Sequence, residues 1–199
     1  SGFMLMATPR ELYLEIAKRY QETGHPCNLT IMHAAGNGNN KDQGIYDMTY
    51  EGLITRYITG HFANNSRMMD LTNENKVAAY NFPQGVIAHM FRAAAAGKPG
   101  EITRIGLNTF CDPRLQGGRL NDAASENLVE LVDILGEEFL LYKVPKLDIG
   151  LIRGTTADEH GNITMEEEGA PVDALDVAMA VKAMGGKVIV QVTNYESGA

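Results

Sequence analysis

The sequence predicts an α/β fold with a mainly parallel sheet and helices on both of its faces. Apolar runs of strand length alternate along the chain with amphipathic runs of helical length. The clearest unit lies near the end of the chain, where Pro171 opens a helix that runs to Met184, two glycines end it, and KVIVQVT at 187–193 forms a buried strand. Helices and strands that alternate in this way build parallel sheets.

The first predicted helix begins near Arg10 and ends at Gly24. The segment Thr8-Pro9-Arg10-Glu11 has the spacing of a capping box, in which the threonine and glutamate side chains bond backbone N–H groups at the helix start. One face of the helix is apolar at 3.6-residue spacing, and it contains Leu12, Ile16, Ala17 and Tyr20. That face predicts a helix packed on the sheet.

The remaining elements follow from the same periodicities and from glycine and proline breaks. A strand at 28–34 opens into the glycine-rich loop GNGNNKDQG at 36–44, and Pro83 and Gly97 bound a helix over 83–96. The apolar runs 128–134 and 139–143 predict an antiparallel hairpin. Further helices are predicted at 48–55 and 68–73, and further strands at 57–62, 77–80, 103–106 and 148–152.

Composition restricts the classes of function. The 199 residues carry a net charge of −8, and the 17 lysines and arginines form no patch, which argues against nucleic-acid binding. No apolar run approaches the roughly 20 residues of a membrane span, so we expect a cytoplasmic protein with no membrane partner. Cys27 and Cys111 lack the spacing of a metal site or a disulfide framework, and we expect no metal ligands. The length suits one domain.

Three segments carry a resemblance to a known enzyme family. They are NFPQGVIAHMF at 81–91, GLNTFCDPRLQGG at 106–118 and LIRGTTADEHGNITM at 151–165. Together they resemble the family I coenzyme A transferases, and most closely the single-chain propionate, acetate and 3-oxoacid CoA-transferases. The resemblance implies the sheet topology that CoA transferases share with glucosamine-phosphate and ribose-phosphate isomerases.

The resemblance covers almost the whole chain but only the first half of such an enzyme. It implies that 1–199 is the N-terminal, alpha-type domain, shortened at its own N-terminus, and that the domain with the catalytic glutamate lies outside this chain. In the family that the chain resembles, this glutamate attacks an acyl-CoA thioester, and a glutamyl-CoA thioester passes CoA to an acceptor acid. Coenzyme A and acyl-CoA are then substrates, and no cofactor is bound permanently.

The implied partners are a C-terminal CoA-transferase domain or subunit, a short-chain carboxylate, an acyl-CoA and further copies of the protein in a homo-oligomer. Ser125-Glu126-Asn127 imitates part of the family's nucleophile motif, Ser-Glu-Asn-Gly. Leu128 stands where the motif has glycine, whose backbone freedom exposes the nucleophile. We therefore assign no catalytic residue in this chain and expect a solvated helical turn there.

Gln84 is the strongest candidate for substrate binding. Pro83-Gln84-Gly85 is similar to the family's Pro-Gln-Gly, whose glutamine borders the bound acid. The predicted helix start also offers free N–H groups and the positive end of a dipole to a carboxylate. The alternative is an ordinary exposed residue in a first helical turn.

Two further candidate segments are the N-terminal Gly2-Phe3 pair and the turn after the strand predicted at 28–34. Gly2 and Phe3 match the end of the family's Gly-Gly-Phe signature, which implies that they line the acyl pocket; alternatively, they are a strand end and a core aromatic. The turn that begins His33-Ala34-Ala35-Gly36 matches one that borders the substrate in relatives, so His33, Ala34 and Gly36 are candidates. His33 could donate to an acid, or it could be a strand-end histidine with its hydrogen bonds satisfied.

A loop after a later strand completes the set. Asn108, Thr109 and Phe110, followed by Asp112-Pro113-Arg114, resemble the family's Gly-Thr-Phe-x-Asp-Pro-Arg segment, on a loop where open α/β sheets place ligands. A plain surface loop is the alternative.

Two other classes of function remain open from the sequence. A sugar-phosphate isomerase on the same fold would need clustered basic residues and an acid/base carboxylate, and Arg104, Arg114 and Arg119 show no obvious cluster. A non-catalytic acyl- or ligand-binding domain would need no nucleophile. Dinucleotide binding is weakly supported, because Gly36-x-Gly38 lacks the third glycine of the fingerprint.

Overall fold

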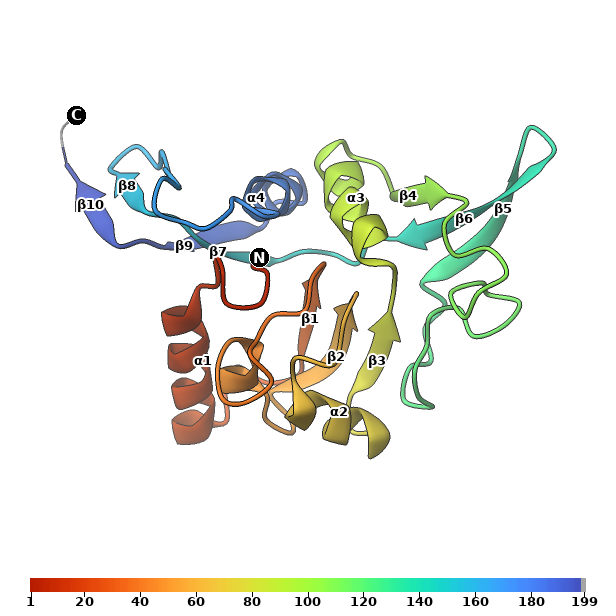
Figure 1. Cartoon of the computed structure of the whole chain (residues 1–199), viewed down its shortest axis with the longest axis horizontal. Helices are drawn as coiled ribbons and strands as arrows, with labels where there is room; N and C mark the ends of the chain where they lie inside the picture. The colour runs from red at the N-terminus through yellow and green to blue at the C-terminus, as the bar shows by residue number, and fades with distance from the viewer. Residues whose placement is uncertain (198–199) are drawn as a thin grey trace.

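A parallel sheet in the order β1 (Leu29–His33), β2 (Ile54–Thr59), β3 (Ala78–Asn81) positions the rest of the chain. The structure is a computed structural model that describes residues 1–197. Parallel strands that follow one another in the sheet bring their carboxyl ends to one edge, and Figure 1 shows the three arrowheads ending beside the start of α3 (Gln84–Ala95) and the N-terminus. We call this the carboxyl edge.

Helices cover both faces of this sheet because successive strand residues point to opposite sides. Tyr57 packs with Tyr13 of α1 (Arg10–Thr23), with the short 3-10 helix η1 (Ile45–Met48) and with α2 (Ser66–Asn73). The next residue, Ile58, belongs to a second cluster that contains the inner faces of α3 and α4 (Ala174–Ala183). The sheet therefore separates two apolar cores.

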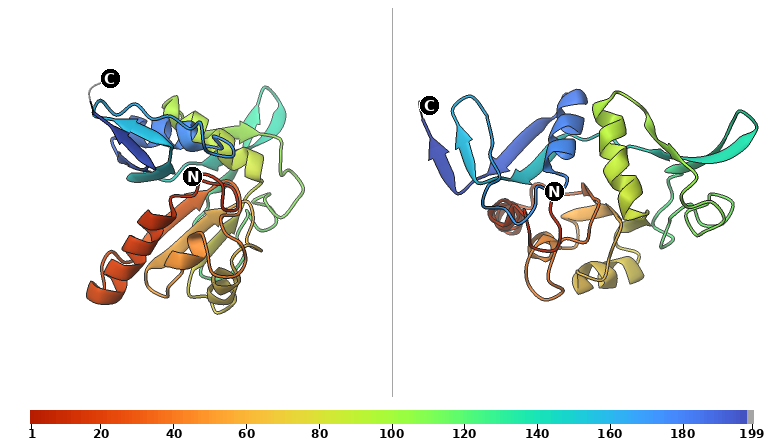
Figure 2. Two further views of the ribbon diagram at one scale, coloured as in Figure 1. Left: turned by 60° about the vertical axis from the view of Figure 1, so that its left-hand side comes forward. Right: turned by 45° about the horizontal axis from the view of Figure 1, so that its top comes forward.

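Small sheets surround the second core. β4 (Gly100–Thr103), β6 (Glu137–Lys143) and β5 (Val129–Ile134) pair antiparallel in that order, and the β5–β6 hairpin extends away from the body (Figure 1). β7 (Ile149–Arg153) pairs parallel with β9 (Lys187–Gln191), and β8 (Thr156–Asp158) pairs parallel with β10 (Asn194–Glu196). α3 and α4 lie side by side in both views of Figure 2, and Arg92 Nε lies 3.0 Å from Asp176 Oδ2 between them.

The α/β class, the parallel strands and the antiparallel hairpin are confirmed, but several details of the predictions are wrong. The strands of the described residues divide into four small sheets. The strand at 187–193 is not buried, since Ile189 keeps 44% of its surface exposed. The strand predicted at 103–106 lies at Gly100–Thr103, because Gly106 adopts a φ of 99° that begins a turn.

The helix predicted at 48–55 is also wrong. The β-branched residues Ile54, Thr55, Ile58 and Thr59 favour a strand, and β2 takes the last two residues of the predicted helix, Ile54 and Thr55, into the sheet. The backbone N–H of Leu53 instead bonds the Tyr50 carbonyl in a turn.

The capping box predicted at Thr8-Pro9-Arg10-Glu11 is absent. Thr8 Oγ1 lies 3.4 Å from Asn37 Oδ1 and the same distance from the Met6 carbonyl, so the hydroxyl serves the N-terminal turn instead of the helix. The backbone N–H of Glu11 donates to Gln191 Oε1 at 3.0 Å. A tertiary contact thus replaces the local cap.

None of the helices within 1–197 has both the length and the apolar character that a membrane crossing requires.

Phe82 joins the sheet to the hairpin, and its truncation tests the second core. The side chain is 1% exposed, and its ring centre lies 5.3 Å from that of Tyr142 in an edge-on arrangement. We expect Phe82→Ala to lower the free energy of unfolding by about 3–5 kcal/mol, because it leaves a cavity between three elements.

Chemical denaturation measures this change. Leu175→Ala on α4 is the matched control, since Leu175 is 70% exposed and should change stability by less than about 0.5 kcal/mol. Equal effects of the two substitutions would contradict the placement of Phe82 in the core.

Candidate functional site

The carboxyl edge brings a turn, a strand end and a helix start into direct contact at Gly60. The backbone N–H of Gly60 donates to the Ala34 carbonyl at 3.1 Å. A Cβ atom on Gly60 would lie 2.6 Å from that carbonyl oxygen and 2.8 Å from Gln84 Cα, so no other residue fits without movement. The absence of a side chain at Gly60 therefore sets how closely Gln84 approaches the turn after β1.

Gln84 begins α3 with its side chain exposed to solvent. The preceding residues are fixed by Thr59, whose carbonyl accepts from Asn81 Nδ2 at 2.9 Å and from the Phe82 N–H at 3.2 Å. The first N–H groups of a helix have no acceptor inside it, and in the described residues no side chain caps α3. The site thus offers an exposed amide and free N–H groups to an anion.

The N-terminal turn is attached to the same edge through the glycine-rich loop. The N–H of Met4 donates to the Gly36 carbonyl at 2.8 Å, and the N–H of Gly38 donates to the Met4 carbonyl at 2.8 Å. Gly2 is buried, with a φ of 130°, and a Cβ there would lie 2.7 Å from Asn37 Nδ2. Phe3 is 37% exposed. Backbone hydrogen bonds thus hold the N-terminal turn against the turn after β1, but only Phe3 of the predicted residues is exposed, and Gly2, Ala34 and Gly36 are buried.

His33 faces the interior and not the surface of this edge. Its Nδ1 contacts the Ala35 carbonyl, and its Nε2 lies 2.6 Å from the Tyr57 hydroxyl. Burial lowers the pKa of His33 to about 4, so the imidazole is neutral near pH 7. The direct donation to an acid that the sequence suggested is not made in this arrangement. The ring instead fixes the turn that contains the buried residues Ala34 and Gly36.

The loop after β4 borders β3. Asn108, Thr109 and Phe110 are exposed, and the loop is organised by Asp112, whose Oδ2 accepts from the Asn108 N–H at 2.9 Å. The Arg114 guanidinium, 2.8 Å from that oxygen, holds the pKa of Asp112 well below its usual range. The same loop packs on the strand end, since Cys111 Sγ lies 3.6 Å from the Asn81 carbonyl.

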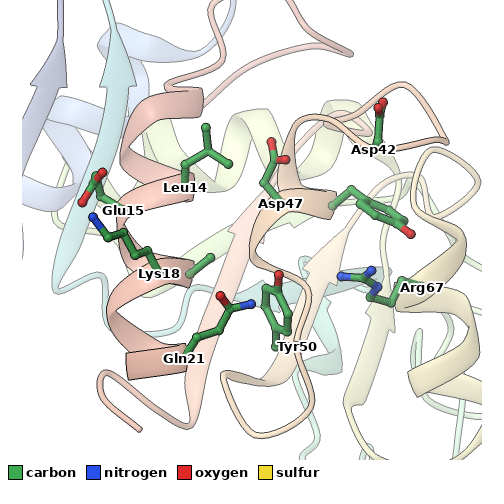
Figure 3. A pocket seen from close by; sticks show the side chains of 10 residues that line it. Leu14, Glu15, Lys18, Gln21, Asp42, Asp47, Tyr50 and Arg67 are labelled. Atoms are coloured by element: carbon green, nitrogen blue, oxygen red, sulfur yellow. The ribbon is translucent and has the colours of Figure 1, made fainter. Parts of the chain in front are cut away.

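A surface hollow of about 390 Å³ lies elsewhere, among α1, η1 and α2 (Figure 3). Arg67 points into it between two tyrosines, 4.4 Å from the ring centre of Tyr46 and 5.4 Å from that of Tyr50. Its Nη1 also donates to the Thr49 carbonyl at 3.3 Å, so Arg67 fastens η1 to α2. The hollow shares no residue with the carboxyl edge. We assign the candidate site to the carboxyl edge because that edge offers an exposed amide and the free N–H groups of a helix start.

Comparison with known proteins identifies the family. The family model described as Coenzyme A transferase matches residues 1–198. The chain belongs to the coenzyme A transferase family. A caffeate CoA-transferase of Acetobacterium woodii is 47% identical to it over 192 residues, which are 96% of this chain and 37% of that protein.

A crystal structure of the Escherichia coli O157:H7 acyl-CoA transferase YdiF, in a thioester complex with CoA, superposes with a TM-score of 0.94 at 42% identity. The match covers 98% of this chain and 38% of that one. A probable coenzyme A transferase subunit alpha of Bacillus subtilis is 25% identical over 143 residues, 71% of this chain and 56% of that subunit. The chain thus spans just over a third of the length of the caffeate CoA-transferase and of YdiF.

Glu126, which imitates the family's nucleophile motif, has a structural role here. Its Oε1 lies 3.0 Å from Arg56 Nη1, and its backbone N–H donates to the Tyr80 hydroxyl at 2.9 Å. Neither partner belongs to the turn after β1 or to the start of α3. The segment is an irregular bend and not the helical turn that the sequence suggested.

Two residues of this candidate site escaped the sequence analysis. Gly60 sets the contact between β2 and α3, and Asn37, 1% exposed, donates its amide to the Ser1 carbonyl at 3.2 Å and to the Tyr13 hydroxyl at 3.4 Å. A glycine directly after a strand, and a polar residue between two glycines, are the signals that could have marked them.

His33 gives the site a measurable pH dependence. The unfolded chain binds a proton at this ring near pH 6.5, whereas the folded chain does so only near pH 4. His33 therefore favours the folded state above pH 6.5, and this contribution is lost as the pH falls toward 4. We expect the wild type to lose up to about 1.4 kcal/mol per pH unit more than His33→Gln in that window.

Denaturation curves between pH 4.5 and 7.5 measure the difference, with exposed His89→Gln as the control. Parallel pH profiles for wild type and His33→Gln would show that the ring is accessible to protons in the folded state.

Proposed function

We propose that this chain is the N-terminal domain, 1–199, of an acyl-CoA:carboxylate CoA-transferase that exchanges CoA between short-chain acids. The observation that carries the proposal is the contact at Gly60, which places Gln84 and the free N–H groups of α3 beside the turn after β1. The names of the relatives, caffeate CoA-transferase and acetate CoA-transferase, support the reaction class. The cytoplasm remains the predicted location.

The carboxyl edge suits an acid or its thioester. Gln84 Nε2 and the N–H groups at the start of α3 can donate to a carboxylate or thioester oxygen. Phe3 is exposed on the N-terminal turn, whereas Ala34 and Gly36 are buried and support the edge through backbone hydrogen bonds. Asn108, Thr109 and Phe110 border the β3 side of the same edge. Coenzyme A and acyl-CoA enter as substrates and not as resident cofactors.

The nucleophile must come from outside the chain on this proposal. Glu126 is paired with Arg56, and the family's glutamate motif is incomplete there. A further domain or subunit would supply the glutamate and close the site against water, which would otherwise hydrolyse an anhydride or thioester intermediate. That the chain spans 37% of a relative's length supports this division.

The sugar-phosphate isomerase alternative is weakened by the arginines. Arg104 lies 2.6 Å from Glu137, and Arg114 is held by Asp112 and Glu138, so these guanidinium groups already have carboxylate partners. A phosphate site would need cations free to converge on one point.

Reconstitution tests the proposal. The isolated chain should transfer no CoA between acetyl-CoA and propionate, and the enzyme formed by joining it to the domain with the glutamate should do so. Glu126→Gln in that enzyme should leave the rate unchanged. Turnover by the chain alone, abolished by Glu126→Gln, would falsify the division of the site.

Gln84→Ala in the joined enzyme tests the acid site. Removal of a donor to the developing oxyanion should cost on the order of 1–3 kcal/mol, or roughly ten- to hundredfold in kcat/KM. Gln84→Glu should be worse, because a carboxylate repels the incoming acid.

Steady-state kinetics with propionate as the varied substrate measure both variants, and thermal unfolding is the control because the exposed side chain supports no core. Unchanged kinetics in both would remove Gln84 from the site.

A further inference from the structure

An exposed imidazole lies on the carboxyl edge, that of His61, directly after Gly60. A Cβ atom on Gly36 would lie 2.9 Å from His61 Cδ2 and 2.9 Å from Asn64 Nδ2, so these two side chains rest against the Gly36 backbone. Gly36 is buried beneath them, although the resemblance to CoA transferases placed it beside the substrate. At this turn a ligand would therefore meet the ring of His61 and not Gly36.

The neighbours of His61 in the chain fix its position. Its backbone N–H donates to Thr59 Oγ1 at 3.3 Å, and that buried hydroxyl lies 3.2 Å from His33 Nδ1. The following residue, Phe62, packs edge-on against Tyr57, with the ring centres 5.3 Å apart. His61 is consequently the exposed residue of a segment whose flanking residues are held by the core.

The imidazole of His61 is free to bind a ligand. Within residues 1–197, the hydrogen bonds that His61 forms involve only its backbone. An imidazole carries at least one N–H donor in either protonation state. The ring therefore keeps a donor available at the carboxyl edge.

His61 and Gln84 approach this edge from opposite sides of β2. A Cβ atom on Gly60 would lie 2.8 Å from Gln84 Cα, and His61 is the next residue in the chain, so the Cα atoms of His61 and Gln84 are at most about 8 Å apart. Gln84 follows β3, whereas His61 contacts the turn after β1. One small anion bound over Gly60 can accept hydrogen bonds from both side chains.

We propose that His61 binds the second oxygen of the acid substrate, while Gln84 and the start of α3 bind the first. This inference rests on the proposed function. A carboxylate offers two oxygen acceptors, whereas a thioester offers one carbonyl oxygen and a sulfur that accepts weakly. A donor on the β1 side of Gly60 therefore favours the free acid over the acyl-CoA. His61 thus makes the site selective for the carboxylic acid that accepts CoA.

Steady-state kinetics of the joined enzyme test this role. His61→Phe keeps a flat ring against Gly36 but removes the donor, and it should raise the KM for propionate about tenfold while the KM for acetyl-CoA stays within about twofold. His61→Gln restores an N–H donor and should bring the KM for propionate back to within about threefold of the wild type. His25→Phe is the matched control, because His25 is also exposed but precedes β1, at the opposite end of the sheet.

Two kinetic results would overturn the role of His61. Equal rises in both KM values for His61→Phe would mean that the ring only supports the turn after β1. Kinetics like those of His25→Phe would mean that the ring does not contact the acid. If Gln84→Ala impairs the same enzyme in either case, the proposed function stands and only the assignment of His61 fails.

A binding measurement separates the two proposals when turnover is absent. The ring C–H signal of isotope-labelled His61, assigned by its loss in His61→Phe, should shift as propionate is added to the joined protein, and the His25 signal should stay in place. A shift without CoA exchange would leave His61 as an acid-binding residue and remove the transferase reaction. A His61 signal that does not move at saturating propionate would refute the assignment.

Discussion

The contact at Gly60 is the constraint on which the carboxyl edge depends. With no Cβ at this position, the end of β2 lies against the Ala34 carbonyl and against the first residue of α3 at once. Any side chain would push one of these elements away. The arrangement of turn, strand end and helix start is therefore set by backbone packing, and the exposed Gln84 side chain remains available for a ligand.

The two cores hold this contact from opposite sides. Tyr57 and the α1 side of the sheet fix His33 and the turn after β1, whereas Phe82 and Tyr142 fix the end of β3 and the segment that leads into α3. Neutral His33, buried Asn37 and ion-paired Asp112 each use their polar groups to shape a loop. The buried polar residues here thus build the site without contacting its open surface.

The sequence predicted those features that depend on local pattern. The helices near residues 10–23, 84–95 and 174–183 and the parallel strands follow from periodicity and from glycine and proline breaks, and the family followed from three motifs. Features that depend on tertiary partners were not predictable in this way. Thr8 contacts Asn37 instead of capping a helix, β2 includes the end of a predicted helix, and the interior orientation of His33 requires Tyr57, which is 24 residues away in the sequence.

The most direct test of the account is a crystal structure of the joined enzyme with propionate bound. The distance from Gln84 Nε2 to a carboxylate oxygen decides the matter. The account expects about 3 Å, a hydrogen bond, with the carboxylate facing the first N–H groups of α3. Propionate bound at another site, with Gln84 still directed into solvent, would contradict it.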